Sequence, residues 1–283
     1  MTYLILVLGI LLTRFYPHSS SFTRNLGFSR WQQAVASSPV VVGRESIQLY
    51  LTIAIPVVSL VLVLLILHYM GWRFVAYGVS LIGLLYAFGV NDLKNTIASY
   101  VADLNRNDVQ AAFHDAASFE ASTSEAEDWS QLHQQTLTAI SWQYFQCYFP
   151  VIFWFAILGT PGAVLYRLLC DYQQLETGAE NLARLTRMRL ILEWLPLRVF
   201  GFSLAIVGNW RATFKQVLAS LGNMAAPPAN LVTAYVVAAL HGEQIPPETD
   251  NPKQEVAELE ELPELIDRAL ISWIALLGVM AVI

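Results

Sequence analysis

The chain has few charged residues for its length, and this shortage excludes most soluble folds. Of its 283 residues only 13% are Asp, Glu, Lys or Arg, whereas 55% are hydrophobic. A soluble domain carries about 25% charged residues. The composition therefore predicts a protein that crosses a membrane several times.

Cysteine and positive charge are also scarce. The two cysteines, Cys147 and Cys170, both lie in an apolar stretch, so no disulfide framework is predicted. The formal net charge of −6 comes mainly from two acidic loops, which argues against nucleic acid as a partner. The five histidines show no ligand spacing, so we predict no metal site and no cofactor.

Motifs of the common enzyme classes are missing as well. The sequence has no Gly-x-x-x-x-Gly-Lys phosphate loop, no Gly-x-Gly-x-x-Gly fingerprint and no Gly-x-Ser-x-Gly elbow. Paired carboxylates occur only in loops, as at Glu125/Glu127 and Glu260/Glu261, where solvation explains them. We therefore predict no catalytic residues and favour a non-enzymatic protein.

Apolar runs predict where the chain crosses the membrane. Residues 47–70 form the clearest span, since a spanning helix needs about 20 apolar residues, and residues 74–90 form the next. Residues 3–12 are shorter and predict an uncleaved N-terminal helix, and residues 269–283 predict a C-terminal anchor. The predicted fold class is all-α: a polytopic helical membrane protein forming one domain over residues 1–283.

Polar segments separate the apolar runs. Residues 91–144 form a helical excursion, in which Asp108 caps a helix or, alternatively, binds a ligand together with Arg106. Residues 242–261 are rich in Pro and Glu with almost no apolar periodicity, so we predict a flexible acidic linker. Residues 171–192 are amphipathic with several arginines, a pattern typical of an interfacial helix beside anionic headgroups.

The stretch around which the chain is organised covers residues 145–198. Arg167, Glu193 and Arg198 lie in or beside its apolar runs, although a charge in hydrocarbon costs at least a few kcal/mol. The sequence Gly-Thr-Pro-Gly at residues 159–162 predicts a broken helix in the core, which is tolerated where the freed backbone lines protein or a wet cavity. Two interpretations stay open: a kinked helix whose arginines reach the interface, or a buried polar site at the break.

The path of this broken segment is also open. Residues 145–158 are too short to span and are typical of a re-entrant arm, whereas residues 145–170 together suffice for a plain kinked span. The positive-inside tendency favours the re-entrant arm. In that arrangement we expect Arg167 to lie near Glu193 and Arg198, and the leftover positive charge suits an anionic ligand such as a phosphate or a carboxylate.

Three motifs stand out in the core and in the polar excursion: Phe153-Trp154-Phe155…Leu158-Gly159…Pro161-Gly162-Ala163…Tyr166-Arg167, Trp194-Leu195-Pro196-Leu197-Arg198…Gly201 and Asn105-Arg106-Asn107-Asp108…Ala111-Ala112. These motifs resemble those of the AmpE family, and the resemblance covers nearly the whole chain. The resemblance implies a regulatory protein of the bacterial inner membrane. It also implies a role as a sensor or modulator in β-lactamase induction and in the recycling of cell-wall muropeptides.

The candidate ligand-binding residues come from these motifs and from the charges of the core. They are Arg106, Asp108, Tyr166, Arg167, Glu193, Trp194 and Arg198. We expect the lipid bilayer as a partner, together with an anionic small molecule or another membrane protein.

The same core is similar to that of the CbiB/CobD cobinamide-phosphate synthases, which are membrane enzymes. This similarity implies the alternative function of a membrane ligase or ligand-binding protein. The magnesium and triphosphate chemistry of those enzymes needs hard oxygen ligands. Here Trp142, Gln143, Gln146 and Cys147 stand at the places of the enzymes' Glu-Asn…Asp-Gly set. We therefore expect no synthase activity.

Overall fold

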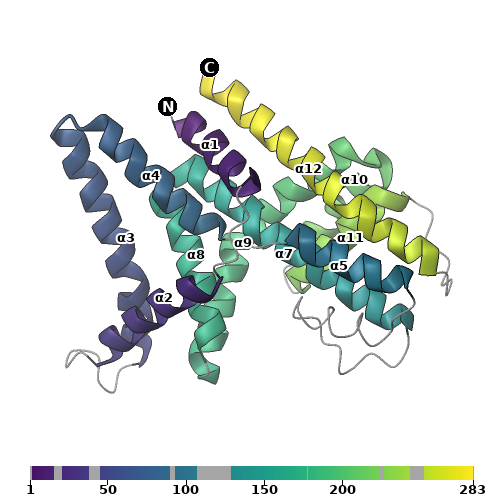
Figure 1. The fold of residues 1–283 in the computed structure, drawn as a ribbon, viewed down its shortest axis with the longest axis horizontal. Coiled ribbons are helices and arrows are strands. Elements are labelled where there is room, and N and C mark those ends of the chain that lie inside the picture. Colours follow the sequence, from purple (N-terminus) through teal and green to yellow (C-terminus); the bar gives the residue numbers. More distant parts are fainter. Residues whose placement is uncertain are drawn as a thin grey trace. The chain divides into compact units, whose positions relative to one another are not determined.

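The protein is described here by a computed structural model in which the described residues are helical and form no β-strand (Figure 1). This agrees with the predicted all-α class. The described residues are 2–15, 21–37, 45–89, 93–106, 129–176, 178–222, 226–242 and 252–282.

Contacts between residues divide the chain into two compact units. Unit 1 comprises Met1–Asn91 and Pro150–Glu193, and unit 2 comprises Asp92–Phe149 and Trp194–Ile283. The sequence predicted one domain over residues 1–283 and did not separate these two sets of helices.

Two long helices contribute residues to both units. Helix α7 (Trp129–Leu158) changes unit at Pro150, and α9 (Ala179–Val207) changes unit just before Pro196. A proline inside a helix removes one backbone hydrogen bond, because its nitrogen carries no proton. In both helices, therefore, the division between the units falls beside a residue that weakens the helix locally.

Unit 1 is built around α8, the helix that follows the break. Helices α3 and α4 pack on α8 and on each other, α1 lies against α4, and α2 crosses α3 and α8 (Figure 1). These helices are α1 (Thr2–Phe15), α2 (Ser21–Ala36), α3 (Glu45–Tyr69), α4 (Arg73–Phe88) and α8 (Thr160–Leu175).

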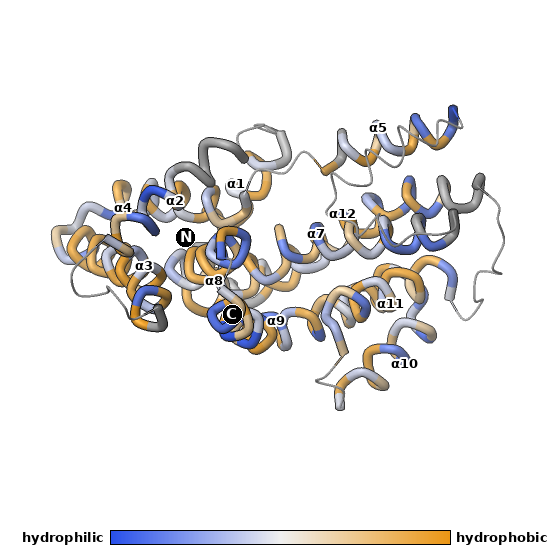
Figure 2. The backbone as a smooth tube through the Cα atoms, turned by 90° about the horizontal axis from the view of Figure 1, so that it is seen from below, coloured by the Kyte–Doolittle hydropathy of each residue, from blue (hydrophilic) through white to orange (hydrophobic). Residues whose placement is uncertain are grey.

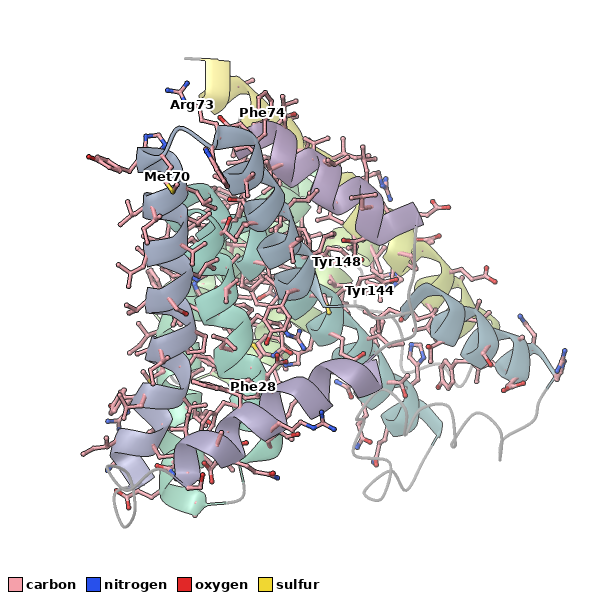
Figure 3. All side chains as sticks on the ribbon, turned by 60° about the vertical axis from the view of Figure 1, so that its left-hand side comes forward. Phe28, Met70, Arg73, Phe74, Tyr144 and Tyr148 are labelled. Carbon is pink, nitrogen blue, oxygen red and sulfur yellow. The ribbon has the colours of Figure 1, made fainter. Side chains whose placement is uncertain are left out.

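The core of unit 1 is apolar and draws on four helices. The ring of Phe28 from α2 (Figure 3) meets the ring of Tyr172 from α8 edge to face, with centroids 6.2 Å apart. Gly83 lets α4 approach α8, because a Cβ there would lie 2.5 Å from Thr160 Cγ2. The buried side chains of this core are Phe28, Leu49, Ile53, Val164, Leu168, Leu169, Tyr172 and Leu185.

Helix α3 presents a long apolar face that no other described helix of unit 1 covers. The span predicted over residues 47–70 coincides with Ile47–Tyr69, a stretch of helix that is long and apolar enough to cross a membrane. Only 17% of the most apolar part of this stretch is buried inside the structure. Figure 2 shows hydrophobic colour along most of α3. Its exposed side chains include Ile55, Val58, Leu62, Val63, Leu65 and Ile66.

Unit 2 surrounds an aromatic core. The ring centroid of Phe149 lies 4.4 Å from that of Phe200 and 5.3 Å from that of Trp273, and Phe145 lies 5.4 Å from Phe200. Helix α11 packs against α10 and α12, and α5 packs against α12. These helices are α5 (Leu93–Asn105), α10 (Trp210–Ser220), α11 (Pro228–His241) and α12 (Pro252–Val282).

The predicted flexible linker differs from the structure in its second half. Residues 243–251 lie outside the described residues, but α12 begins at Pro252, and Leu259 and Leu262 are fully buried. Glu258 is buried too, because its carboxylate oxygens lie 3.0 Å from His133 Nε2 and 2.9 Å from His241 Nε2. The acidic composition concealed a helix that is held by buried partners.

Two predicted boundaries in the core are wrong as well. The boundary at residue 145 is wrong, because α7 starts at Trp129 and is continuous over 30 residues, about 45 Å. The choice between a re-entrant arm and a plain kinked span stays a prediction. The predicted interfacial helix over residues 171–192 is divided: α8 ends at Leu175, and α9 begins at Ala179 and continues past Glu193.

Candidate functional site

The helix break predicted at residues 159–162 is confirmed, and α8 begins directly after it. Helix α7 ends at Leu158, Gly159 has φ +69°, and α8 starts at Thr160 with Pro161 in its first turn. Glycine adopts a positive φ without steric cost, and proline fits the first turn because the N–H it lacks would have no helical acceptor. The break thus starts a new helix whose residues from Tyr166 to Tyr172 are buried.

The first polar contact on α8 joins Arg167 to Asp171, one helical turn later. Arg167 Nε donates to Asp171 Oδ1 at 2.9 Å, and Arg167 Nη2 lies 2.8 Å from the same oxygen. Tyr86 of α4 donates its hydroxyl to Asp171 Oδ2 at 2.9 Å. Asp171 is 2% exposed. Each carboxylate oxygen therefore accepts a strong hydrogen bond, which offsets part of the cost of burying the charge.

The second polar contact joins α8 to α9 through Glu193. Tyr166 donates its hydroxyl to Glu193 Oε1 at 2.8 Å, and Arg189 Nη2 donates to the same oxygen at 2.7 Å. Arg189 Nη1 also donates to Gln173 Oε1 at 2.6 Å. Glu193 is 2% exposed, so the pair is desolvated. Arg189 thereby holds one side chain from each helix.

Trp154 of α7 contributes a further bond in unit 1. Its indole N–H donates to the backbone carbonyl of Leu192 at 3.1 Å. In a regular helix this carbonyl would accept from the residue four positions later, which is Pro196 and has no N–H. Trp154 therefore supplies the donor that the proline removes.

The charges of this network are matched. Arg167 pairs with Asp171 and Arg189 with Glu193, both four residues apart along a helix. For the re-entrant arrangement, the sequence predicted that Arg167 would lie near Glu193 and Arg198 and leave a surplus positive charge in the core. Among the described residues of unit 1, the partners of Glu193 are instead Arg189 and Tyr166. The expected surplus is therefore not found there.

Arg198, a candidate residue of unit 2, lies on α9 and is 3% exposed. Its Nη1 donates to the hydroxyl of Tyr235 at 2.8 Å, and its Nη2 donates to the backbone carbonyl of Ser220 at 2.8 Å. Ser220 is the last residue of α10, where helix carbonyls lack helical donors and attract cations. The Ser220 hydroxyl and the Tyr235 hydroxyl form a short hydrogen bond with each other.

Trp194 and Gly201 shape the surroundings of Arg198. The Cζ atom of Arg198 lies 5.7 Å from the ring centroid of Trp194, a cation–π distance. A Cβ on Gly201 would lie 2.6 Å from Val217 Cγ2 and 2.9 Å from the Tyr235 ring. Glycine at this position lets α10 and α11 come close enough for their polar groups to reach the guanidinium.

The polar motif of the excursion contributes no site among the described residues. The side chain of Arg106 is 76% exposed, and its ion pair is with Asp103 at 3.8 Å. Asp108 lies outside the described residues. Binding by Arg106 and Asp108 stays a prediction.

Several residues of these networks were missed at the level of sequence. Asp171 and Arg189 could have been found, because each stands four residues from a candidate, Arg167 or Glu193. Tyr86 and Tyr235 could not, because they join their partners only through packing between helices. Among the described residues, no three His, Cys, Asp or Glu side chains gather in a way that could hold a metal ion.

Together these features define a class of all-α protein in which apolar helices enclose buried arginines. Two of its helices, over Ile47–Tyr69 and Ala179–Val207, are long and apolar enough to cross a membrane. The chain belongs to the AmpE family: the family model, described as "Regulatory signalling modulator protein AmpE", matches residues 1–282. This confirms the resemblance and a regulatory role. No curated protein and no solved structure matches the chain.

Proposed function

We propose that this protein is a non-enzymatic modulator in the bacterial inner membrane that acts in β-lactamase induction and muropeptide recycling. The family description supports the regulatory part. The observation that carries the membrane part is the uncovered apolar face of α3. Soluble proteins rarely expose apolar patches of this length.

The dimensions of α3 suit a bilayer. Its 25 residues are about 37 Å long, which exceeds the hydrocarbon thickness of about 30 Å. Exposed aromatic side chains lie at the connection between α3 and α4: Tyr69 ends α3, Trp72 lies in the turn, and Phe74 lies in the first turn of α4. Arg73, the first residue of α4, is next to Phe74 in the sequence, and both are labelled in Figure 3. Aromatic and basic residues are typical of the boundary between lipid and water. This supports a crossing that ends near residues 69–74.

The buried carboxylates support a non-enzymatic role. Asp171 and Glu193 each accept hydrogen bonds from an arginine and from a tyrosine of their own unit. Magnesium-dependent transfer needs carboxylate oxygens that are available to the ion. Carboxylates bonded in this way instead hold α4, α8 and α9 together.

The test of the regulatory role is a dose–response measurement of β-lactamase activity against a β-lactam inducer, in cells with and without the gene. We expect deletion to shift the inducer concentration that gives half-maximal activity, and the wild-type gene to restore it. Arg189→Gln should fail to restore it, whereas Arg187→Gln, an exposed position on the same helix, should succeed. An unchanged dose–response after deletion would contradict the proposal.

A second experiment addresses the alternative of a membrane ligase. The chain is expressed in a strain that lacks cobinamide-phosphate synthase and needs that activity to grow. We expect no growth, with membrane-bound expression verified by immunoblot. Growth would show that the chain is an enzyme.

A further inference from the structure

We infer that Arg198 and Trp194 form the donor side of a binding site for an anionic oxygen group, a carboxylate or a phosphate. The guanidinium of Arg198 is 3% exposed, yet no carboxylate among the described residues lies within ion-pair distance of it. An arginine stays charged when it is buried, and burying a charge is costly unless an opposite charge lies close to it.

Two hydrogen-bond donors at this place lack acceptors. Arg198 donates through Nη1 and Nη2, but its Nε is buried and has no hydrogen-bond partner among the described residues. The indole Nε1 of Trp194 is also buried and likewise has no partner in the described part of the chain. Both nitrogens are donors only, so neither can be satisfied by another donor. The two residues stand one helical turn apart on α9, with the guanidinium near the indole ring.

The shortage is one of acceptors and of negative charge, and this defines the ligand. A carboxylate or phosphate supplies several acceptor oxygens and the missing charge in one group, and arginine binds both in a fork. A neutral molecule or a single water would supply an acceptor without the charge. The site therefore fits an anion rather than a sugar hydroxyl or an amide.

The surroundings hold the guanidinium in place before any ligand binds. Tyr235 and the Ser220 carbonyl fix its two terminal nitrogens, and Gly201 allows that approach. Tyr235 is fully buried, whereas Trp194 is only partly buried. The indole of Trp194 is thus the member of the site closest to the surface, and its displacement would admit the anion.

The inference does not depend on the proposed role in induction, because anion binding is measured on the purified chain. Two sources share the required chemistry: a free anion, or the phosphate of a lipid headgroup. In the first arm, inorganic phosphate and, separately, acetate are titrated into the full chain in a non-ionic detergent. The heat of binding and the midpoint of thermal unfolding are measured. The second arm compares nanodiscs of phosphatidylcholine with nanodiscs that also contain phosphatidylglycerol.

We expect saturable binding in at least one arm, with a rise in the unfolding midpoint. Arg198→Gln should weaken this binding by more than about tenfold, because the charge is lost. Trp194→Phe, which keeps an aromatic ring but removes the N–H, should weaken it by about two- to tenfold. Arg187→Gln, an exposed arginine of the same helix, should leave it unchanged.

The outcomes separate cleanly. Binding of phosphate or acetate assigns a free anion, and a response to phosphatidylglycerol alone assigns a lipid headgroup. If Arg198→Gln fails to fold, Trp194→Phe carries the test. The inference is overturned if no anion binds in either arm. It is also overturned if Trp194→Phe binds the anion as tightly as the wild type and the control Arg187→Gln do.

Discussion

The two units bury arginines in opposite ways. In unit 1, Arg167 and Arg189 each meet a carboxylate four residues along the same helix. In unit 2, Arg198 meets a hydroxyl and a carbonyl, which are polar but uncharged. The matched pairs of unit 1 hold helices together, whereas the absence of a counter-charge beside Arg198 among the described residues is the basis of the anion site that we propose.

The largest effect is expected from breaking a matched pair in unit 1. Glu193→Gln removes the carboxylate that pairs with the largely buried Arg189, and breaking a buried ion pair typically costs about 3–5 kcal/mol. The free energy of unfolding in detergent measures this loss. The control is Glu180→Gln, whose carboxylate is 75% exposed and pairs with Arg184, and which should stay within about 0.5 kcal/mol of the wild type. Equal effects of the two variants would contradict the distinction between buried and exposed pairs.

A smaller loss is expected from enlarging Gly201 in unit 2. Gly201→Ala places a Cβ 2.6 Å from Val217 and so forces α9 away from α10, at about 1–3 kcal/mol. Gly78→Ala in α4 is the matched control, because nothing lies within 4 Å of its new Cβ. Alanine is the better helix former by about 0.5–1 kcal/mol, so this variant should be slightly stabilised. Thermal unfolding of both variants checks the sign of each effect.

Removing the unmatched arginine should cost less than breaking a matched pair. Arg198→Met in the absence of added anions loses two hydrogen bonds to neutral groups and leaves no charge stranded, at about 1–3 kcal/mol. Arg189→Met removes the arginine that pairs with the buried carboxylate of Glu193, so its cost should be as large as that of breaking a matched pair. Chemical denaturation of both variants in one detergent measures the difference. A larger loss for Arg198→Met would show that the unit 2 arginine is primarily structural.

The smallest effect is expected at the indole of Trp154. Trp154→Phe removes the donor to the Leu192 carbonyl and should cost about 0.5–1.5 kcal/mol. In a Pro196→Ala background the same substitution should cost less, because alanine restores the backbone N–H of the helix. Additive effects in the double variant would show that Trp154 does not replace the missing donor.

The sequence predicted local features of the fold well. The α3 span follows from an uninterrupted apolar run, and the break at Gly159 follows from glycine and proline, whose backbone preferences act without tertiary partners. The sequence failed where packing overrides local preference. Pro196 lies inside α9, where the indole of Trp154 donates to the carbonyl of Leu192 that the proline leaves free. Glu258 did not mark a linker because His133 and His241 hold it.

The candidate site was predicted as a list of residues but not as pairs. Tyr166, Arg167, Glu193 and Arg198 are all buried, as residues of a polar site would be. Their partners depend on which helix faces are joined, and a sequence does not state this. The spacing of four residues between Arg189 and Glu193 was available, but the arginines of residues 171–192 were assigned to an interfacial helix beside anionic headgroups. Tyr86 had no signal in the sequence, since it reaches Asp171 only through the packing of α4 on α8.

The central claim is that the charges of unit 1 compensate each other, and a double-mutant cycle on Arg189 and Glu193 tests it most directly. The free energy of unfolding is measured for the wild type, Arg189→Gln, Glu193→Gln and the double variant. We predict that Glu193→Gln costs much less in the Arg189→Gln background than in the wild type, with a coupling of about 2–3 kcal/mol. Costs that simply add would contradict the claim.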